Sequence, residues 1–256
     1  MDFLRKDFSR SSLVRLLGDW APVPADASRQ DFAQRLGQWL DVSDAITLHA
    51  AHQSIKPVAG GMTSGARAGV AKALGEDFHR VRTALVKSIM ASGVAPPARN
   101  NRDRSLLPQP EGVAEADAGF APYQQRYLEQ QRQMALRIEA LRGHVRQAAS
   151  MASPRLAPLA AMDAVLEPMF GAREQKLMGT VPALLERRFE QLRTAHRLDM
   201  EARQQPDDPA LWRQPGGWQH RFGRDMEAAL LAELDVRLQP VTGMMEALNN
   251  EVEKHT

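Results

Sequence analysis

Residues 218–238 read WQHRFGRDMEAALLAELDVRL, and a large apolar side chain stands at every fourth position of this stretch. These side chains are Trp218, Phe222, Met226, Leu230, Leu234 and Leu238. A spacing of four residues is close to the 3.6-residue turn of an α-helix and far from the two-residue alternation of a strand. The slow drift of this repeat around the helix predicts burial against more than one neighbour. The stretch therefore predicts a long, buried helix.

Apolar stripes of helical period occur along most of the chain. They predict helices around residues 13–20, 32–48, 70–89, 123–145, 156–170, 184–192, 218–238 and 244–248, with Pro240 interrupting the chain between the last two. Aromatic residues are only 5% of the chain, which disfavours sheets. We expect an all-α fold, a multi-helix bundle of about seven or eight helices with a Pro-rich linker in the middle.

Six side chains within these stripes are predicted to be buried in the core: Trp39, Phe78, Leu85, Phe189, Phe222 and Leu230. Between the stripes lie segments without apolar period. Residues 56–69, KPVAGGMTSGARAG, predict a flexible loop, and residues 204–217, QQPDDPALWRQPGG, predict a turn-rich connector.

The most marked linker signal covers residues 92–119, which are rich in proline and glycine and poor in large apolar groups. The predicted organisation is an N-terminal helical region over residues 1–91, the linker over 92–119, and a helical bundle over 120–256. That last bundle either stands alone or forms one composite domain with residues 1–91.

Composition limits the function classes. The chain has 256 residues, 43% of them apolar, which is enough for a real core. It has no cysteine, which excludes disulfides and thiolate chemistry, and its formal net charge is only +2. No stretch is apolar for long enough to be a signal peptide or a membrane span. We therefore expect a cytoplasmic protein without direct membrane insertion.

No catalytic constellation stands out in the sequence. His49 and His52 are spaced for a shared metal on one helix, with Asp41 or Asp44 as further ligands, but such a pair without a third nearby ligand is a weak signal. Asp207 and Asp208, in a proline-flanked turn, are interpreted as capping or solvated groups. The other histidines are scattered among charged neighbours. We expect no enzyme, no metal and no cofactor.

Basic side chains on two predicted helices, together with one tryptophan, are the candidate contacts to nucleic acid or to a protein partner: Arg80, Arg82, Lys87, Arg187, Arg188, Arg193, Arg197 and Trp212. Phosphate binding needs such charges gathered on one surface. Glutamates interleave with the arginines of the second helix, a pattern typical of a solvated helix face. Trp212 lies in the connector and is expected to be partly exposed, where it could anchor an interface.

Several long segments, in order, carry a resemblance to a known family: SSLVRLLGDW, DFAQRLGQWLDVSDAITLHAA, FHRVRTALVKSI, FAPYQQRYLEQQRQM, TVPALLERRFEQLR, WRQPGGWQHRFGRDMEAALLAELDVRLQPV and MEALNNEV. The chain resembles an uncharacterised proteobacterial domain-of-unknown-function family. Its members are encoded beside a MotA/TolQ-like protein and an OmpA/MotB-like protein. This arrangement resembles the type III Zorya anti-phage defence systems.

The resemblance implies a soluble accessory or effector subunit and supplies no catalytic residues. Its implied partners are a companion soluble defence protein, the cytoplasmic part of a MotA/MotB-like motor, or both, and a homo-oligomer is a further option. The alternative is a DNA-binding effector that engages phage DNA through the basic helices.

Overall fold

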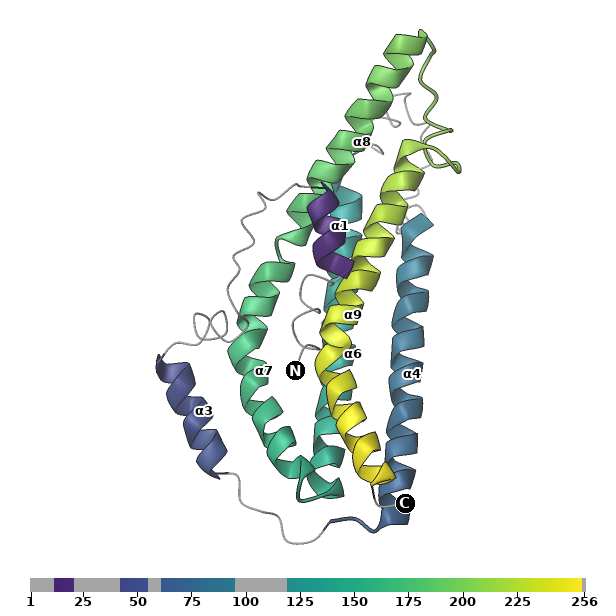
Figure 1. The fold of residues 1–256 in the computed structure, drawn as a ribbon. Coiled ribbons are helices and arrows are strands. Elements are labelled where there is room, and N and C mark those ends of the chain that lie inside the picture. The colour runs from purple at the N-terminus through teal and green to yellow at the C-terminus, as the bar shows by residue number, and fades with distance from the viewer. Residues whose placement is uncertain (1–11, 21–41, 55–60, 95–118, 255–256) are drawn as a thin grey trace, which may run out of the picture. The chain divides into compact units, whose positions relative to one another are not determined.

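The computed structural model describes residues 12–20, 42–54, 61–94 and 119–254, and within these ranges the chain forms seven α-helices and no strand (Figure 1). They are α1 (Ser12–Trp20), α3 (Val42–Ser54), α4 (Ser64–Val94), α6 (Ala121–Ala152), α7 (Leu156–Met178), α8 (Val181–Arg203) and α9 (Trp218–Glu253). The predicted all-α fold is confirmed. Trp39, the first part of the helix predicted over residues 32–48, and nearly all of the linker predicted at residues 92–119 lie outside the described residues. The end of that predicted helix, from Val42, lies in α3.

Contacts between Cα atoms divide the chain into two units. Unit 1 comprises residues 1–21, 84–134 and 180–234, and unit 2 comprises residues 22–83, 135–179 and 235–256. Each unit combines segments from before and after the predicted linker. The division of the chain into regions 1–91 and 120–256 stays a prediction.

Unit 1 is built around an aromatic core. Phe189 on α8 and Phe222 on α9 meet edge to face at 5.1 Å, and Tyr123 on α6 lies 5.1 Å from Phe222. The predicted burial of Leu85, Phe189, Phe222 and Leu230 is confirmed, because all four are fully buried. This core supports the start of α9 and the facing part of α8.

A carboxyl group is buried in the same unit. Glu233 on α9 has no exposed surface, and Oε2 of Glu233 accepts a hydrogen bond of 2.8 Å from the Tyr127 hydroxyl. The Gln131 amide donates to both Glu233 oxygens, at 3.1 and 2.9 Å. These hydrogen bonds replace the ones that the carboxyl group would make with water in the unfolded chain.

In unit 2, α3 packs against α7, and α7 is joined to α6 by ion pairs. Arg142 and Arg146 on α6 both bond to Asp163 on α7, at 2.6 and 2.9 Å, and Arg146 also bonds to Glu167. Phe78 is half-buried and not buried as predicted. The Phe78 ring lies edge-on to the ring of the exposed His79, with the ring centroids 5.8 Å apart.

The glycine-rich segment predicted as a loop over residues 56–69 is partly helical, because α4 begins at Ser64. The start of this helix is stabilised by contacts with residues that are distant in the sequence, which a local pattern does not show. Arg67 is only 7% exposed, and its guanidinium donates to the carbonyl oxygens of Ala152 (3.1 Å), Glu251 (3.4 Å) and Met62 (3.1 Å). Two of these carbonyls lie in the last turns of helices α6 and α9, where carbonyl groups lack partners within the helix.

The interruption predicted at Pro240 is wrong, since α9 continues through it to Glu253. Proline removes one backbone donor from a helix, but buried side chains on both sides of it hold the two halves in line. These side chains are Leu238, Val241, Met244 and Leu248.

Candidate functional site

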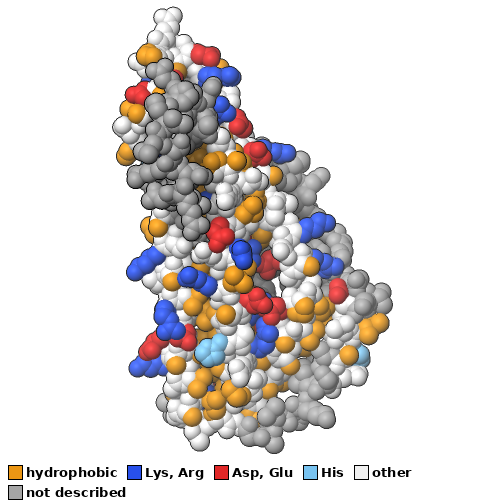
Figure 2. Space-filling model, turned by 180° about the vertical axis from the view of Figure 1, so that it is seen from behind, with side chains coloured by type: hydrophobic (Ala, Val, Ile, Leu, Met, Phe, Trp, Pro, Cys, Tyr) orange, Lys and Arg blue, Asp and Glu red, His pale blue; other side chains and the backbone are white. Residues whose placement is uncertain are grey.

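The basic side chains singled out in the sequence lie mostly beside carboxylates. Five of the seven form ion pairs: Arg80 with Asp77 (2.6 Å), Arg82 with Asp235 (3.5 Å), Arg188 with Asp225 (2.7 Å), Arg193 with Glu190 (3.8 Å) and Arg197 with Glu201 (3.8 Å). Lys87 and Arg187 are exposed. On the face shown in Figure 2, acidic and basic side chains likewise lie close to one another. Charge is therefore balanced locally around most of the candidate arginines.

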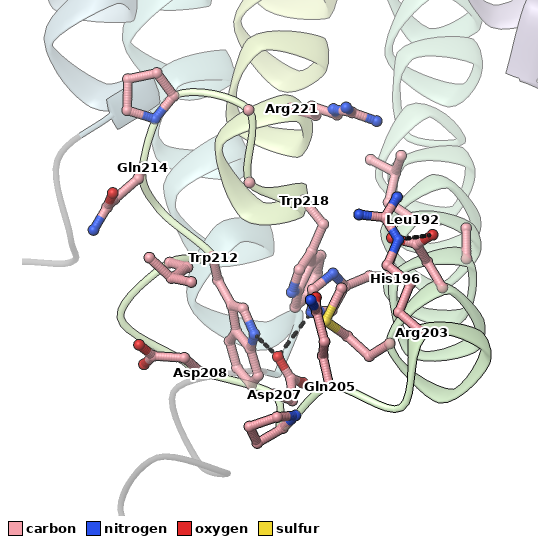
Figure 3. Close-up of a pocket in the computed structure, with 18 residues that line it drawn as sticks. Leu192, His196, Arg203, Gln205, Asp207, Asp208, Trp212, Gln214, Trp218 and Arg221 are labelled. Atoms are coloured by element: carbon pink, nitrogen blue, oxygen red, sulfur yellow. Dashed lines mark hydrogen bonds and ion pairs between the residues drawn. The ribbon is translucent and has the colours of Figure 1, made fainter.

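The eighth candidate, Trp212, lines a cavity of about 630 Å³ within unit 1 (Figure 3). The cavity lies between α8, the connector of residues 204–217 and the start of α9. We call this cavity the Trp pocket. Its lining residues are Leu192, Ala195, His196, Asp199, Met200 and Arg203 of α8, Gln205, Pro206, Asp207, Asp208, Leu211, Trp212, Gln214, Pro215, Gly216 and Gly217 of the connector, and Trp218 and Arg221 of α9. The volume is in the range of ordinary ligand pockets.

The local sequence explains how the connector turns back to form this pocket. Gln204 ends α8 in the left-handed conformation, with φ of 51°, and Gly216 has φ of 93°, a region that favours glycine. At Gly217 a Cβ atom would overlap the carbonyl oxygens of Leu211 and Trp212. Only glycine therefore lets Trp212 lie so close to the start of α9.

Asp207 is the polar centre of the pocket. Its Oδ1 lies 2.8 Å from His196 Nε2 and accepts a 2.7 Å hydrogen bond from Trp212 Nε1. Partial burial works against ionisation of Asp207, but the hydrogen bonds from Trp212 and His196, with the charge of His196, lower its pKa below the ordinary value. Asp207 is therefore ionised at neutral pH and fixes the indole and the imidazole on either side of it.

Aromatic rings join this polar centre to the core of unit 1. Trp218 lies between Trp212 and His196 (Figure 3), with ring centroids 5.5 Å from Trp212 and 6.3 Å from His196. Its other neighbour is Phe189, at 5.1 Å. Because Phe189 and Trp218 are buried, the wall of the pocket is a direct extension of the core.

Two buried donors at the start of α9 have no acceptor among the described residues. Trp218 is 4% exposed, and its Nε1 is a buried donor with no acceptor. The second such donor is the Gln219 Nε2 atom, on the residue that follows Trp218. Arg221 is exposed, and its guanidinium extends from α9 towards α8 (Figure 3).

Part of this site follows from the sequence and part does not. The predicted partial exposure of Trp212 is confirmed. Asp208 has the capping role expected for it, since its Oδ1 accepts the Ala210 backbone N–H at 2.9 Å. Asp207 is exposed, as expected of a solvated group, but its bonds to His196 and Trp212 were not predicted. The signal available was the density of aromatic residues between positions 212 and 222.

Metal-ligating groups give no comparable site. In the described ranges, no three His, Cys, Asp or Glu side chains gather in a way that could hold a metal ion. His49 lies within 2.8 Å of Gln53 through their Nε2 atoms, and the His52 side chain and Asp41 lie outside the described residues. Among the helices of the described ranges, none has both the length and the hydropathy needed to cross a membrane.

Comparison with known proteins gives a family and nothing further. No curated protein and no solved structure is detectably similar to the chain. One family model matches residues 2–250, almost the entire length. The chain belongs to the family described as "Protein of unknown function (DUF3348)".

Proposed function

We propose that this protein is a helical accessory subunit of a motor-linked anti-phage defence system of the type III Zorya kind, and that it acts in the cytoplasm by binding companion defence proteins. Its direct partner is the companion protein or the cytoplasmic part of the MotA/MotB-like motor. The sequence resemblance supports the proposed role in defence. The Trp pocket supports the proposal that the protein acts by binding another protein.

The Trp pocket has the composition of an interface anchor. Tryptophan and arginine dominate binding hot spots, and the pocket combines both types on a rigid aromatic wall. Leu211, which also lines the pocket, is 54% exposed. A large apolar side chain in water beside a partly exposed tryptophan offers apolar surface that a partner would bury at a gain of about 25 cal/mol per Å².

A DNA-binding effector is the alternative function. It is favoured by Lys87 and Arg187, which have no carboxylate within 4 Å among the described residues. It is disfavoured by the five paired arginines, because a duplex would have to compete with their carboxylates for the same guanidinium groups. Isolated surface pairs contribute only about 0 to 1 kcal/mol, so such competition weakens DNA binding without abolishing it.

The test is an affinity pull-down of the tagged chain from cells that express the neighbouring genes, infected and uninfected, with and without nuclease. We expect the companion protein to be retained after nuclease treatment. Trp212→Ala should lose it. Leu136→Ala, which removes an apolar side chain of α6 that is 59% exposed, should keep the companion protein bound. Circular dichroism of each variant verifies its helix content.

Retention that disappears on nuclease treatment would favour the DNA effector. So would binding of a duplex by the isolated chain at about 200 mM salt, where contacts to six or more phosphates are already weakened by roughly three decades relative to 50 mM. Loss of that binding in a variant with Arg187, Arg188, Arg193 and Arg197 replaced by Gln would locate the DNA on α8.

A further inference from the structure

We propose that α3 is a displaceable cover on an apolar face of α7, and that this face binds an amphipathic helix of a protein partner when α3 leaves it. The face belongs to unit 2, whereas the Trp pocket belongs to unit 1, so this binding function goes beyond the one proposed above. The orientation of α7 carries the proposal, because the side that α7 turns to α6 and α9 is ionic and its apolar residues lie on another side.

Charged groups hold α7 against α6 and α9. Asp163 of α7 bonds to Arg142 of α6 at 2.6 Å and to Arg146 at 2.9 Å. Further along α7, Glu174 pairs with Arg237 of α9 at 3.4 Å. From residue 161 to residue 177, no side chain of α7 is buried. A helix of a bundle usually turns its apolar stripe to the core, so the contacts with α6 and α9 do not explain where the apolar residues of α7 lie.

These apolar residues lie about a quarter turn around the helix from the ion pairs. They are three or four residues apart, the spacing of the seam of a coiled coil, which a second helix completes. Leu159 is 41% exposed and Leu177 is 60% exposed, while the apolar side chains between them are half-buried. We call this seam the α7 stripe, and its members are Leu159, Met162, Leu166, Met169, Arg173 and Leu177.

The α3 helix lies beside α7 (Figure 1) and covers the α7 stripe incompletely. Asp44 Oδ2 of α3 lies 3.9 Å from Arg173 Nη2, which places α3 at the stripe. None of the α3 side chains that the structure describes is buried, and Ile46 is 64% exposed. With 13 residues α3 is about 20 Å long, whereas the stripe from Leu159 to Leu177 is about 27 Å long. The stripe therefore accepts a helix and is longer than the one that it holds.

Arg173 indicates the chemistry of the partner helix. Its distance of 3.9 Å from Asp44 is too long for a hydrogen bond, and its buried Nη1 has no acceptor among the described residues. The Arg173 side chain as a whole is 41% exposed, and departure of α3 would also free it from Asp44. A carboxylate on a replacing helix could then bond to the planar fork of the guanidinium. The expected partner helix carries apolar residues three and four apart, with one Asp or Glu among them.

The experiment uses the full chain and a synthetic amphipathic peptide of about 20 residues, a length at which strong helix formers give a stable helix. The peptide has leucine at coiled-coil spacing and one glutamate in the middle of its leucine stripe. Fluorescence anisotropy measures its affinity, and hydrogen exchange follows the backbone amides of the chain. We expect the bound peptide to slow exchange in α7 and to speed exchange in α3, because α3 has been displaced. Replacing the glutamate by lysine should weaken binding about 10-fold.

Variants of α3 and α7 locate the peptide. Leu48→Ala weakens the cover, since Leu48 lies one turn after Asp44 and is half-buried, and binding should tighten about 10-fold if α3 is docked in about nine chains of ten. Ile46→Ala is the control on the exposed side of α3 and should change nothing. Leu177→Ala should weaken binding about 10-fold. Leu136→Ala, 59% exposed on α6, is its matched control.

A covalent bridge tests the displacement itself. The chain has no cysteine, so in a variant with Asp44→Cys and Arg173→Cys a bismaleimide joins only these two positions. The bridged protein should not bind the peptide, and the same protein before bridging should bind it. Because Arg173 is absent from this variant, the glutamate and lysine peptides should bind the unbridged form equally. Circular dichroism verifies that bridging leaves the helix content unchanged.

The following results would overturn the proposal. Equal binding before and after bridging would show that the peptide binds elsewhere or leaves α3 in place. No binding to the wild type, to Leu48→Ala or to the unbridged variant would show that the α7 stripe takes no second helix. Faster exchange in α3 must accompany binding, and its absence would refute displacement. Trp212→Ala should bind the peptide like the wild type, so failure at α7 is distinguishable from failure of the Trp pocket.

Discussion

Arg67 offers the sharpest test of how the fold is held together. Arg67→Met keeps the apolar stem of the side chain and removes the guanidinium, which donates to three backbone carbonyls in a site only 7% exposed. A hydrogen bond that involves a charged group contributes about 1.5 to 3 kcal/mol. The 3.4 Å bond to Glu251 is the weakest of the three, and such contributions are not additive. We expect the free energy of unfolding to fall by about 3 to 5 kcal/mol.

The assay is urea denaturation followed by far-UV circular dichroism, supported by the thermal midpoint. For a chain of this size, the expected loss corresponds to a fall in Tm of roughly 6 to 20 °C. Arg155→Met is the matched control, because the Arg155 side chain is exposed, and it should change stability by less than about 0.5 kcal/mol. An unfolding midpoint for Arg67→Met equal to that of the control would refute the role assigned to the guanidinium.

Three further predictions concern unit 1. Tyr127→Phe removes the hydroxyl that donates to the buried Glu233 and should cost about 1 to 3 kcal/mol in chemical denaturation, whereas an unchanged midpoint would show that the bond contributes nothing. Gly217→Ala places a methyl group against two carbonyl oxygens, so the near-UV dichroism of the tryptophans should change even if far-UV dichroism does not. The pKa of Asp207 is lowered in the fold, so its stabilising effect is present above the unfolded pKa of about 3.9 and is lost as pH falls through the folded value. The stability difference between wild type and Asp207→Asn should therefore shrink as the pH falls below the unfolded pKa, and a difference that grows on acidification would contradict the sign.

Local sequence pattern predicts the fold class because helices depend on contacts three and four residues apart. Leu85, Phe189, Phe222 and Leu230 could be placed in the core from spacing alone, and their burial is confirmed. The same reasoning fails where a distant residue decides the outcome. The glycines between residues 56 and 69 favour a loop, but the contacts of Arg67 with Ala152 and Glu251 stabilise a helix start that only the folded chain can provide.

The site was less predictable than the fold for a related reason. His196 and Asp207 are eleven residues apart and lie on different elements, so neither helical nor strand spacing brings them together. The left-handed turn at Gln204 lies between them and turns the chain back, and the glycines at 216 and 217 then let Trp212 lie close to the start of α9. Trp212 could be singled out because a large aromatic residue in a proline-rich connector is unusual, whatever its neighbours are.

The central claim is that this chain works by binding a protein through the Trp pocket. Biolayer interferometry with the immobilised companion protein tests it most directly, with two variants compared with the wild type. One is Trp212→Ala, and the other replaces Arg187, Arg188, Arg193 and Arg197 with Gln. The account predicts that Trp212→Ala loses companion binding by at least about 30-fold, the size of a hot-spot truncation of 2 kcal/mol, while the arginine variant binds like the wild type. Full binding by Trp212→Ala together with loss in the arginine variant would contradict it.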